Sequence, residues 1–213
     1  MKTKELKLSN KTKKEEQQLD HLQILLRYIF DLFATTARVF NMSKYIENNI
    51  SKRKEEGKNE GQWGFIQSSR IDNLILILNR LEIGSFVDLG SGCGILITIV
   101  KIYYLHIYNK FIKVAGYEIE DDLVKIGSYY HVCRKNILTL DKEDIKSFEA
   151  LYFYEPLQSP TLAKEFVENL ESIMYSGQYI IYARAGSIYE YLNKCELLIY
   201  LGEHFNHYIY KKI

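Results

Sequence analysis

The sequence has few of the residues that build disulfide frameworks and zinc sites. Its 213 residues include only three cysteines, Cys93, Cys133 and Cys195, without a Cys-x-x-Cys pair or a Cys/His cluster. Structural zinc sites usually show closely spaced ligand pairs, so this spacing predicts no bound metal. Scattered cysteines are typical of a reducing compartment, which predicts a cytoplasmic protein.

The sequence also lacks an excess of charge and a long apolar run. Lysine and arginine number 28 against 27 aspartate and glutamate, a net charge of +1, whereas nucleic-acid-binding domains are usually clearly basic. The longest apolar run, residues 95–108, is shorter than the roughly 20 residues of a membrane span and includes Lys101 and His106. Residues 1–18 are charged throughout, unlike a secretory signal. We therefore expect no membrane partner.

The most informative segment is FVDLGSGCG, residues 86–94. An apolar run leads to Asp88, and Gly90, Gly92 and Gly94 follow at alternate positions before a second long apolar run. This order predicts a buried strand, a glycine turn and a helix. Because glycine has no side chain, such a turn lets the backbone approach a ligand closely.

The spacing distinguishes between nucleotide-type ligands. A dinucleotide fingerprint is Gly-x-Gly-x-x-Gly, and its third glycine would fall at Ile95. A carboxylate at Asp88 would repel a pyrophosphate, but it suits a ligand that carries sulfonium and ammonium groups. Glu118, at the end of the next predicted strand, offers two acceptor oxygens that match the paired hydroxyls of a ribose. The pattern therefore favours S-adenosylmethionine over a dinucleotide.

On these motifs, the chain from about residue 64 to residue 213 resembles the class I, Rossmann-like S-adenosylmethionine-dependent methyltransferases. VDLGSGCG corresponds to the first motif of the family, GYEIEDDL to its acidic second-strand motif, KNIL to its adenine segment and LYFYEPL to the end of its fourth strand. The resemblance implies an α/β fold with a doubly wound, seven-stranded, mostly parallel sheet and an antiparallel C-terminal hairpin. It also implies that the cofactor S-adenosylmethionine contacts Asp88, Gly90, Gly92, Gly94, Glu118, Ile119, Asn136 and Ile137.

Two positions depart from the family pattern. Asn136 stands where aspartate is commoner, although its amide oxygen can still accept a hydrogen bond from an adenine amino group. Residues 154–157, YEPL, differ from the [DN]-P-P-[YF] signature for methylation of amino groups on bases and glutamine. The second departure leaves the methyl acceptor open.

The resemblance places Glu155 at the carboxyl end of the fourth strand, where it would orient or deprotonate the acceptor. A role for Glu155 as a helix-dipole or hydrogen-bonding residue, with no catalytic part, is an equal alternative. Tyr154, Pro156 and Trp63 are expected on the acceptor side. Arg70 is a candidate contact to the carboxylate of the methionine portion.

The remaining patterns complete the fold. We interpret residues 61–213 as the methyltransferase domain and residues 1–60 as a lysine-rich leader followed by a helical extension. Apolar residues recur at helical spacing between residues 15 and 48, which predicts an amphipathic helix. That helix would form a lid over the acceptor site, or dock against another copy or a partner. Strands are expected at residues 150–154, 178–185, 195–202 and 207–213, with a helix capped by Ser159 and Pro160.

The methyl acceptor is a macromolecule in this interpretation. Small methyltransferases with a similar first motif and C-terminal hairpin include protein lysine methyltransferases, so the resemblance favours a protein lysine. RNA is the alternative acceptor, and the near-neutral charge counts against it. A third hypothesis is a non-catalytic subunit that keeps the fold and docks through its N-terminal helix.

Overall fold

The computed structural model describes residues 68–154, 156–157, 159–183, 186–204 and 206–213. The predicted N-terminal helix, Trp63 and Glu155 lie outside these residues. Arg70 is described as part of a helix, but its side chain is not.

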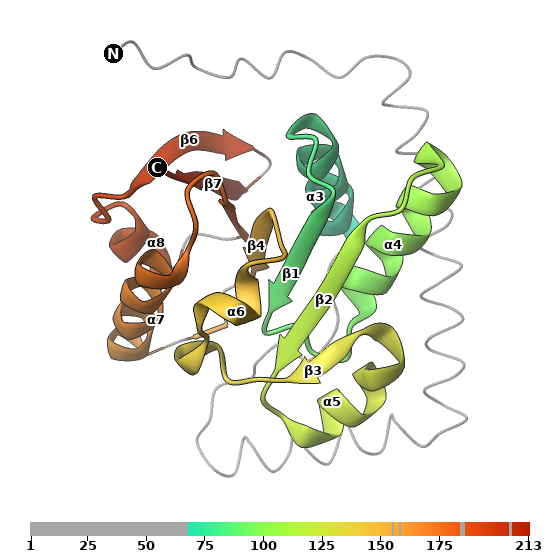
Figure 1. The fold of residues 1–213 in the computed structure, drawn as a ribbon, viewed down its shortest axis with the longest axis horizontal. Coiled ribbons are helices and arrows are strands. Elements are labelled where there is room, and N and C mark those ends of the chain that lie inside the picture. The colour runs from blue at the N-terminus through green and yellow to red at the C-terminus, as the bar shows by residue number, and fades with distance from the viewer. Residues whose placement is uncertain (1–67, 155, 158, 184–185, 205) are drawn as a thin grey trace.

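The core of the fold is a seven-stranded sheet with the strand order β3-β2-β1-β4-β5-β7-β6 (Figure 1). Neighbouring strands are parallel from β3 to β5, whereas β7 is antiparallel to both β5 and β6. The predicted mostly parallel sheet with an antiparallel hairpin is therefore confirmed. The strands are β1 (Ser85–Leu89), β2 (Lys113–Glu118), β3 (Val132–Arg134), β4 (Ala150–Phe153), β5 (Tyr179–Ala183), β6 (Leu198–His204) and β7 (His207–Lys212).

Helices cover both faces of the sheet and enclose two separate apolar cores (Figure 1). The first face carries α3 (Ser68–Arg80), α4 (Ile95–Tyr108) and α5 (Asp121–Gly127). The second face carries α6 (Lys142–Ile145), α7 (Pro160–Ile173) and α8 (Ser187–Leu192). Short 3₁₀ turns, η1 (Ser128–Tyr130) and η2 (Ile137–Thr139), flank β3.

Alternate residues of the central strands β1, β4 and β5 enter the two cores, as strand geometry requires. On β1, Phe86 packs in the first core and Val87 in the second. On the neighbouring β4, Tyr152 and Leu151 divide in the same way. Because both faces of these central strands are buried, they are largely apolar runs, and this is the pattern that predicts them in the sequence.

Local sequence signals fix the starts of two long helices. α4 begins directly after the third glycine, at the bounds that its apolar run predicted. At the start of α7, the hydroxyl of Ser159 accepts a hydrogen bond from the N–H of Leu162, and Pro160 occupies the first turn. Within the described part of the chain, no helix combines the length and apolar character needed to cross a bilayer.

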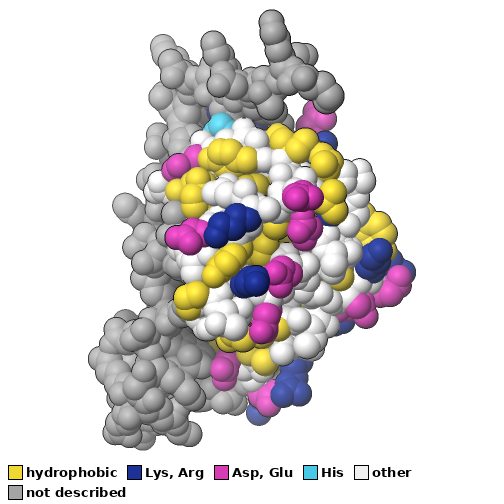
Figure 2. Space-filling model, turned by 90° about the vertical axis from the view of Figure 1, so that its left-hand side faces the viewer, with side chains coloured by type: hydrophobic (Ala, Val, Ile, Leu, Met, Phe, Trp, Pro, Cys, Tyr) yellow, Lys and Arg dark blue, Asp and Glu magenta, His cyan; other side chains and the backbone are white. Residues whose placement is uncertain are grey.

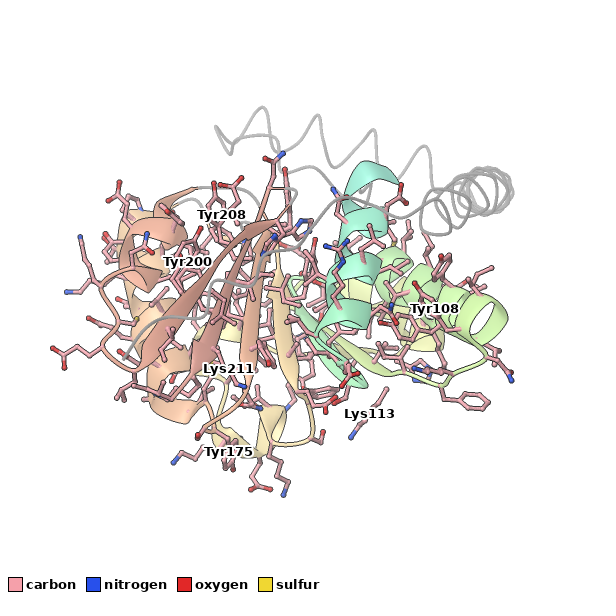
Figure 3. The ribbon with its side chains drawn as sticks, turned by 90° about the horizontal axis from the view of Figure 1, so that it is seen from above. Tyr108, Lys113, Tyr175, Tyr200, Tyr208 and Lys211 are labelled. Carbon is pink, nitrogen blue, oxygen red and sulfur yellow. The ribbon has the colours of Figure 1, made fainter. Side chains whose placement is uncertain are left out.

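The C-terminal hairpin differs in detail from its prediction. β6 starts three residues later than expected and continues to His204, and its pairing with β7 shifts register between Tyr200 and Gly202. Tyr200 and Tyr208 lie on the hairpin side of the molecule, and Tyr108 lies on the opposite side of α3 (Figure 3). Most hairpin tyrosines are buried or half-buried, which supports a packing role for them.

Candidate functional site

The glycine turn follows β1 and is anchored on β2. Gly90, Gly92 and Gly94 have φ values of 85°, 57° and 80°, a left-handed conformation that side chains disfavour. The N–H groups of Gly90 and Ser91 both donate to the carbonyl oxygen of Tyr117, at 2.8 and 3.1 Å. The predicted glycines are therefore required by the backbone path of the turn.

The turn packs closely against its surroundings. A Cβ atom on Gly94 would lie 2.7 Å from Cγ2 of Val132, which is too close for any side chain. Gly90 is exposed, and a Cβ atom there would lie 3.0 Å from Cβ of Pro156. The structure thus brings Pro156, predicted on the acceptor side, next to the glycine turn.

Two acidic side chains end neighbouring strands on the same face of the sheet. Asp88 on β1 pairs in register with Gly116 on β2, and Glu118 stands two residues further along β2. Since alternate residues of a strand share a face, Asp88 and Glu118 lie on the same side. Both are buried, with 3% and 9% of their surface exposed. The two carboxylates predicted to flank the ligand are therefore close enough to influence each other.

Glu118 is held by backbone hydrogen bonds from two segments. Its Oε2 accepts from the N–H of Gly92 at 2.9 Å. Its Oε1 accepts from the N–H groups of Ile119 and Glu120, at 2.8 and 3.1 Å. Donors of this kind stabilise a negative charge on the carboxylate. The bond from Gly92 also ties the glycine turn to the end of β2.

Asp88 has a different environment. Burial, and then the nearby charge of Glu118, raises the pKa of Asp88 from 3.8 to about 8. Within the described residues, no group donates a hydrogen bond to its carboxyl oxygens. Among the described residues, Asp88 is thus a buried acid without a compensating donor, beside a carboxylate that has three.

The residues predicted to contact adenine follow two neighbouring strands: Ile119 comes after β2, and Asn136 and Ile137 come after β3. Ile119 is exposed over 51% of its surface, and Ile137 is half-buried against the second core. Asn136 caps η2, and its Oδ1 accepts from the N–H of Leu138 at 3.0 Å. The amide oxygen that we expected to face adenine is therefore engaged within its own turn, which leaves the amide N–H₂ group and one lone pair.

Tyr154 is half-buried and packs against the first core at the end of β4.

Cys93, inside the glycine turn, is buried, and burial raises the pKa of its thiol. A raised pKa disfavours the thiolate, which supports a packing role for Cys93 and not a nucleophilic one.

Sequence reasoning missed Ser91. Its hydroxyl is buried in the turn, and no described group bonds to it. It lies over Gly116, where a Cβ atom would stand 2.4 Å from the Ser91 oxygen. The position of Ser91 between two glycines of the first motif was the only indication in the sequence. That it packs on Gly116 of β2 is seen only in the structure.

Comparison with solved structures identifies the fold. No protein-family model matches the sequence, and no curated protein matches it. A Staphylococcus aureus protein, assigned provisionally as a caffeoyl-CoA O-methyltransferase, superposes with a TM-score of 0.51 at 14% identity, over 88% of this chain and 98% of that one. The sheet order and this similarity show the Rossmann-like fold of class I methyltransferases.

Two further structures are similar at lower scores. The N-methyltransferase NodS from Bradyrhizobium japonicum gives a TM-score of 0.45 at 12% identity, over 65% of this chain and 94% of that one. The methyltransferase domain of bacterial CtHen1 gives 0.43 at 14% identity, over 54% of this chain and 63% of that domain. The chain therefore spans less than two thirds of the length of the CtHen1 domain.

Proposed function

We propose that this chain, which has the class I methyltransferase fold, binds S-adenosylmethionine and transfers its methyl group to a nucleophilic acceptor. The observation that carries the proposal is the placement of Asp88 and Glu118. They end adjacent strands on one face of the sheet, with the left-handed glycine turn beside them. Ligands of open α/β sheets bind outside the carboxyl ends of the strands, which is where both carboxylates lie.

The described residues fit this cofactor. Asp88, which receives no hydrogen bond from them, suits an ammonium or sulfonium group, because its ionised form lacks any other compensating partner among the described residues. Oε2 of Glu118 accepts one N–H and keeps a second lone pair for a ribose hydroxyl. The exposed side chain of Ile119, directly after Glu118, offers an apolar surface to an adenine ring.

The methyl sulfonium supplies an already activated methyl carbon, so the protein must chiefly position the two reactants. Positioning of this kind can lower the activation free energy by several kcal/mol, on the order of the effects measured for intramolecular reactions. The glycine turn, fixed by Tyr117 and Glu118, would hold the cofactor. Pro156, beside the turn, and Tyr154, which follows β4, would border the acceptor and exclude water from it.

An amine acceptor must lose a proton before it reacts. A lysine side chain ordinarily titrates near ~10.4, so a base is needed at neutral pH. We assign this role to Glu155, which follows Tyr154 in the sequence. The assignment rests on its position after β4 and on the chemistry of a carboxylate as a proton acceptor.

We favour a protein lysine as the acceptor over RNA. The net charge of +1 gives no general attraction to a phosphate backbone. On the face shown in Figure 2, lysine and arginine side chains are interspersed with aspartate and glutamate, without a stripe of one sign. Cell lysate incubated with the protein and a radiolabelled methyl donor tests the choice. If protease treatment removes the radiolabel and ribonuclease treatment does not, the acceptor is a protein. The reverse result supports RNA.

Calorimetric titration with S-adenosylmethionine tests the cofactor assignment. The wild type should bind, and Glu118→Ala should bind at least tenfold more weakly, because hydrogen bonds to a charged group are lost. Glu168→Ala, an exposed carboxylate on α7 and on the other side of the sheet, is the matched control and should bind normally. Absence of binding by the wild type would overturn the proposal and favour a non-catalytic subunit.

A further inference from the structure

The two buried carboxylates of the site are compensated unequally. Glu118 accepts three backbone N–H groups, whereas Asp88 accepts none from the described residues. The neighbour of Asp88 on its other side is Tyr152 of β4, a member of the apolar first core. Two adjacent buried carboxylates cannot both ionise cheaply, and the proton goes to the one with the weaker compensation.

Among the described residues, other charged groups do not change this balance. Arg80 lies at the end of α3 that leads into β1, away from the carboxyl end of the strand, and Lys101 is exposed on α4. Apart from His207 on β7, two strands beyond Tyr152, the described titratable groups of the first core are carboxyls, a thiol and phenols. The buried ones are Asp72 on α3, Cys93 in the turn, Tyr103 and Tyr104 on α4, Glu118 on β2 and Tyr152 on β4. Tyr108, Tyr154 and Tyr179 are half-buried against the same core.

We propose that Asp88 carries a proton while the site is empty and releases it to solvent when the cationic cofactor binds. The inference rests on the proposed function and adds that cofactor affinity is linked to pH through this residue. The direction of the pKa agrees with it, since burial and the charge of Glu118 raise the pKa of Asp88 to about 8. A bound sulfonium and ammonium would reverse that shift, because opposite charges favour the ionised carboxylate.

This coupling has a defined sign. Below pH 8, binding requires a proton to leave Asp88, so affinity should rise with pH, by up to about tenfold per unit. Near pH 8 the dependence should level off as Asp88 ionises in the free protein. The amino group of the cofactor also titrates near ~7.7–8.0, so experiments at pH 6.5 keep that group charged and isolate the contribution of Asp88.

The test is calorimetric titration with S-adenosylmethionine at pH 6.5 in two buffers of different ionisation enthalpy. The difference between the observed enthalpies gives the number of protons released on binding. We expect about one proton for the wild type and none for Asp88→Asn, which keeps the shape of the side chain but cannot ionise. Glu168→Gln, on the other side of the sheet, should match the wild type in both affinity and proton release.

The outcomes separate this inference from the proposed function. Binding by the wild type without proton release overturns the inference and leaves the proposed cofactor in place. No binding by the wild type overturns both. If Asp88→Asn fails to fold, an infrared difference spectrum of the wild type replaces it. The band of a protonated carboxyl group should disappear when the cofactor is added, and a spectrum without that loss counts against the inference.

Discussion

The hydroxyl of Ser91 occupies the space that a side chain on Gly116 would need. A Cβ atom built on Gly116 stands 2.4 Å from the Ser91 oxygen and 2.6 Å from its Cβ atom. The glycine turn therefore rests directly on the backbone of β2. This contact, together with the bond from Gly92 to Glu118, sets how close the turn lies to the second carboxylate.

Gly116→Ala should displace the turn. Overpacking of this kind typically costs about 1–3 kcal/mol of stability, and we expect S-adenosylmethionine affinity to fall at least tenfold as well. Gly84→Ala is the matched control, because its Cβ atom would make only an ordinary contact at 3.4 Å with Glu149. Urea denaturation and calorimetric titration measure the two effects. Normal cofactor binding by Gly116→Ala would show that the turn does not depend on this contact.

Asp88 should make the empty protein less stable as the pH rises from about 4 to about 8. Its pKa is raised from 3.8 to about 8 on folding, so between these values the folded state binds more protons than the unfolded state. The free energy of unfolding should therefore decrease as pH rises from about 4 to 8. Urea denaturation at several pH values should show this trend in the wild type. In Asp88→Asn the slope should be smaller, and an unchanged slope would assign the effect to other groups.

The three cysteines should differ sharply in reactivity. Cys133 is exposed, whereas Cys93 is buried. Burial, followed by the charge of Glu171, raises the pKa of Cys195 to about 12. At pH 8 a thiol reagent should therefore modify Cys133 first, and Cys133→Ser should abolish the fast phase. Cys93→Ala should retain cofactor affinity, since we assign Cys93 a packing role, and loss of binding in this variant would contradict that role.

Gln178 should matter for stability but not for the cofactor. Its side chain N–H₂ donates to the carbonyl oxygens of Ile145 and Phe148, at 2.9 and 2.7 Å, and its Oε1 accepts from the N–H of Tyr175 at 2.8 Å. Gln178→Met would remove all three bonds, and among the described residues only the Ile145 carbonyl would keep another donor, the N–H of Phe148. This loss should cost at least about 2 kcal/mol in urea denaturation.

Cofactor affinity should stay unchanged in Gln178→Met, because the residue lies at the amino end of β5, away from the glycine turn. The exposed hydroxyl of Ser172 bonds only to the carbonyl of Asn169 in its own helix. Ser172→Ala should therefore cost less than about 0.5 kcal/mol and serves as the control. A similar cost for both variants would mean that the buried hydrogen bonds of Gln178 add little.

Much of the fold could be predicted because its strands are buried on both faces. Such strands are continuous apolar runs, and the glycines at 90, 92 and 94 marked the end of β1 and the start of α4. Ser159 and Pro160 did the same for α7. The start of β6 was predicted three residues early, because the apolar pattern of residues 195–201 does not mark the turn at residues 196–197 that precedes the strand.

The details of the site could not be predicted in the same way. The bonds from Gly92 to Glu118 and the contact of Ser91 with Gly116 join segments about 25 residues apart, and their geometry depends on strand register. The local bond within the turn at Asn136 was within reach of the sequence, since asparagine often accepts from an N–H two residues on. From the sequence, we predict only its contact with adenine.

The place of β7 in the sheet has a consequence for biosynthesis. β7 is the last strand in sequence order, yet it lies between β5 and β6. While the ribosome is still translating residues 207–212, β6 has no partner in the sheet, and the outer edge of β5 is open. The parallel half of the domain can form early during synthesis, but the sheet closes only after this segment has left the exit tunnel. A nascent chain stalled just before it should therefore present an open strand edge to chaperones.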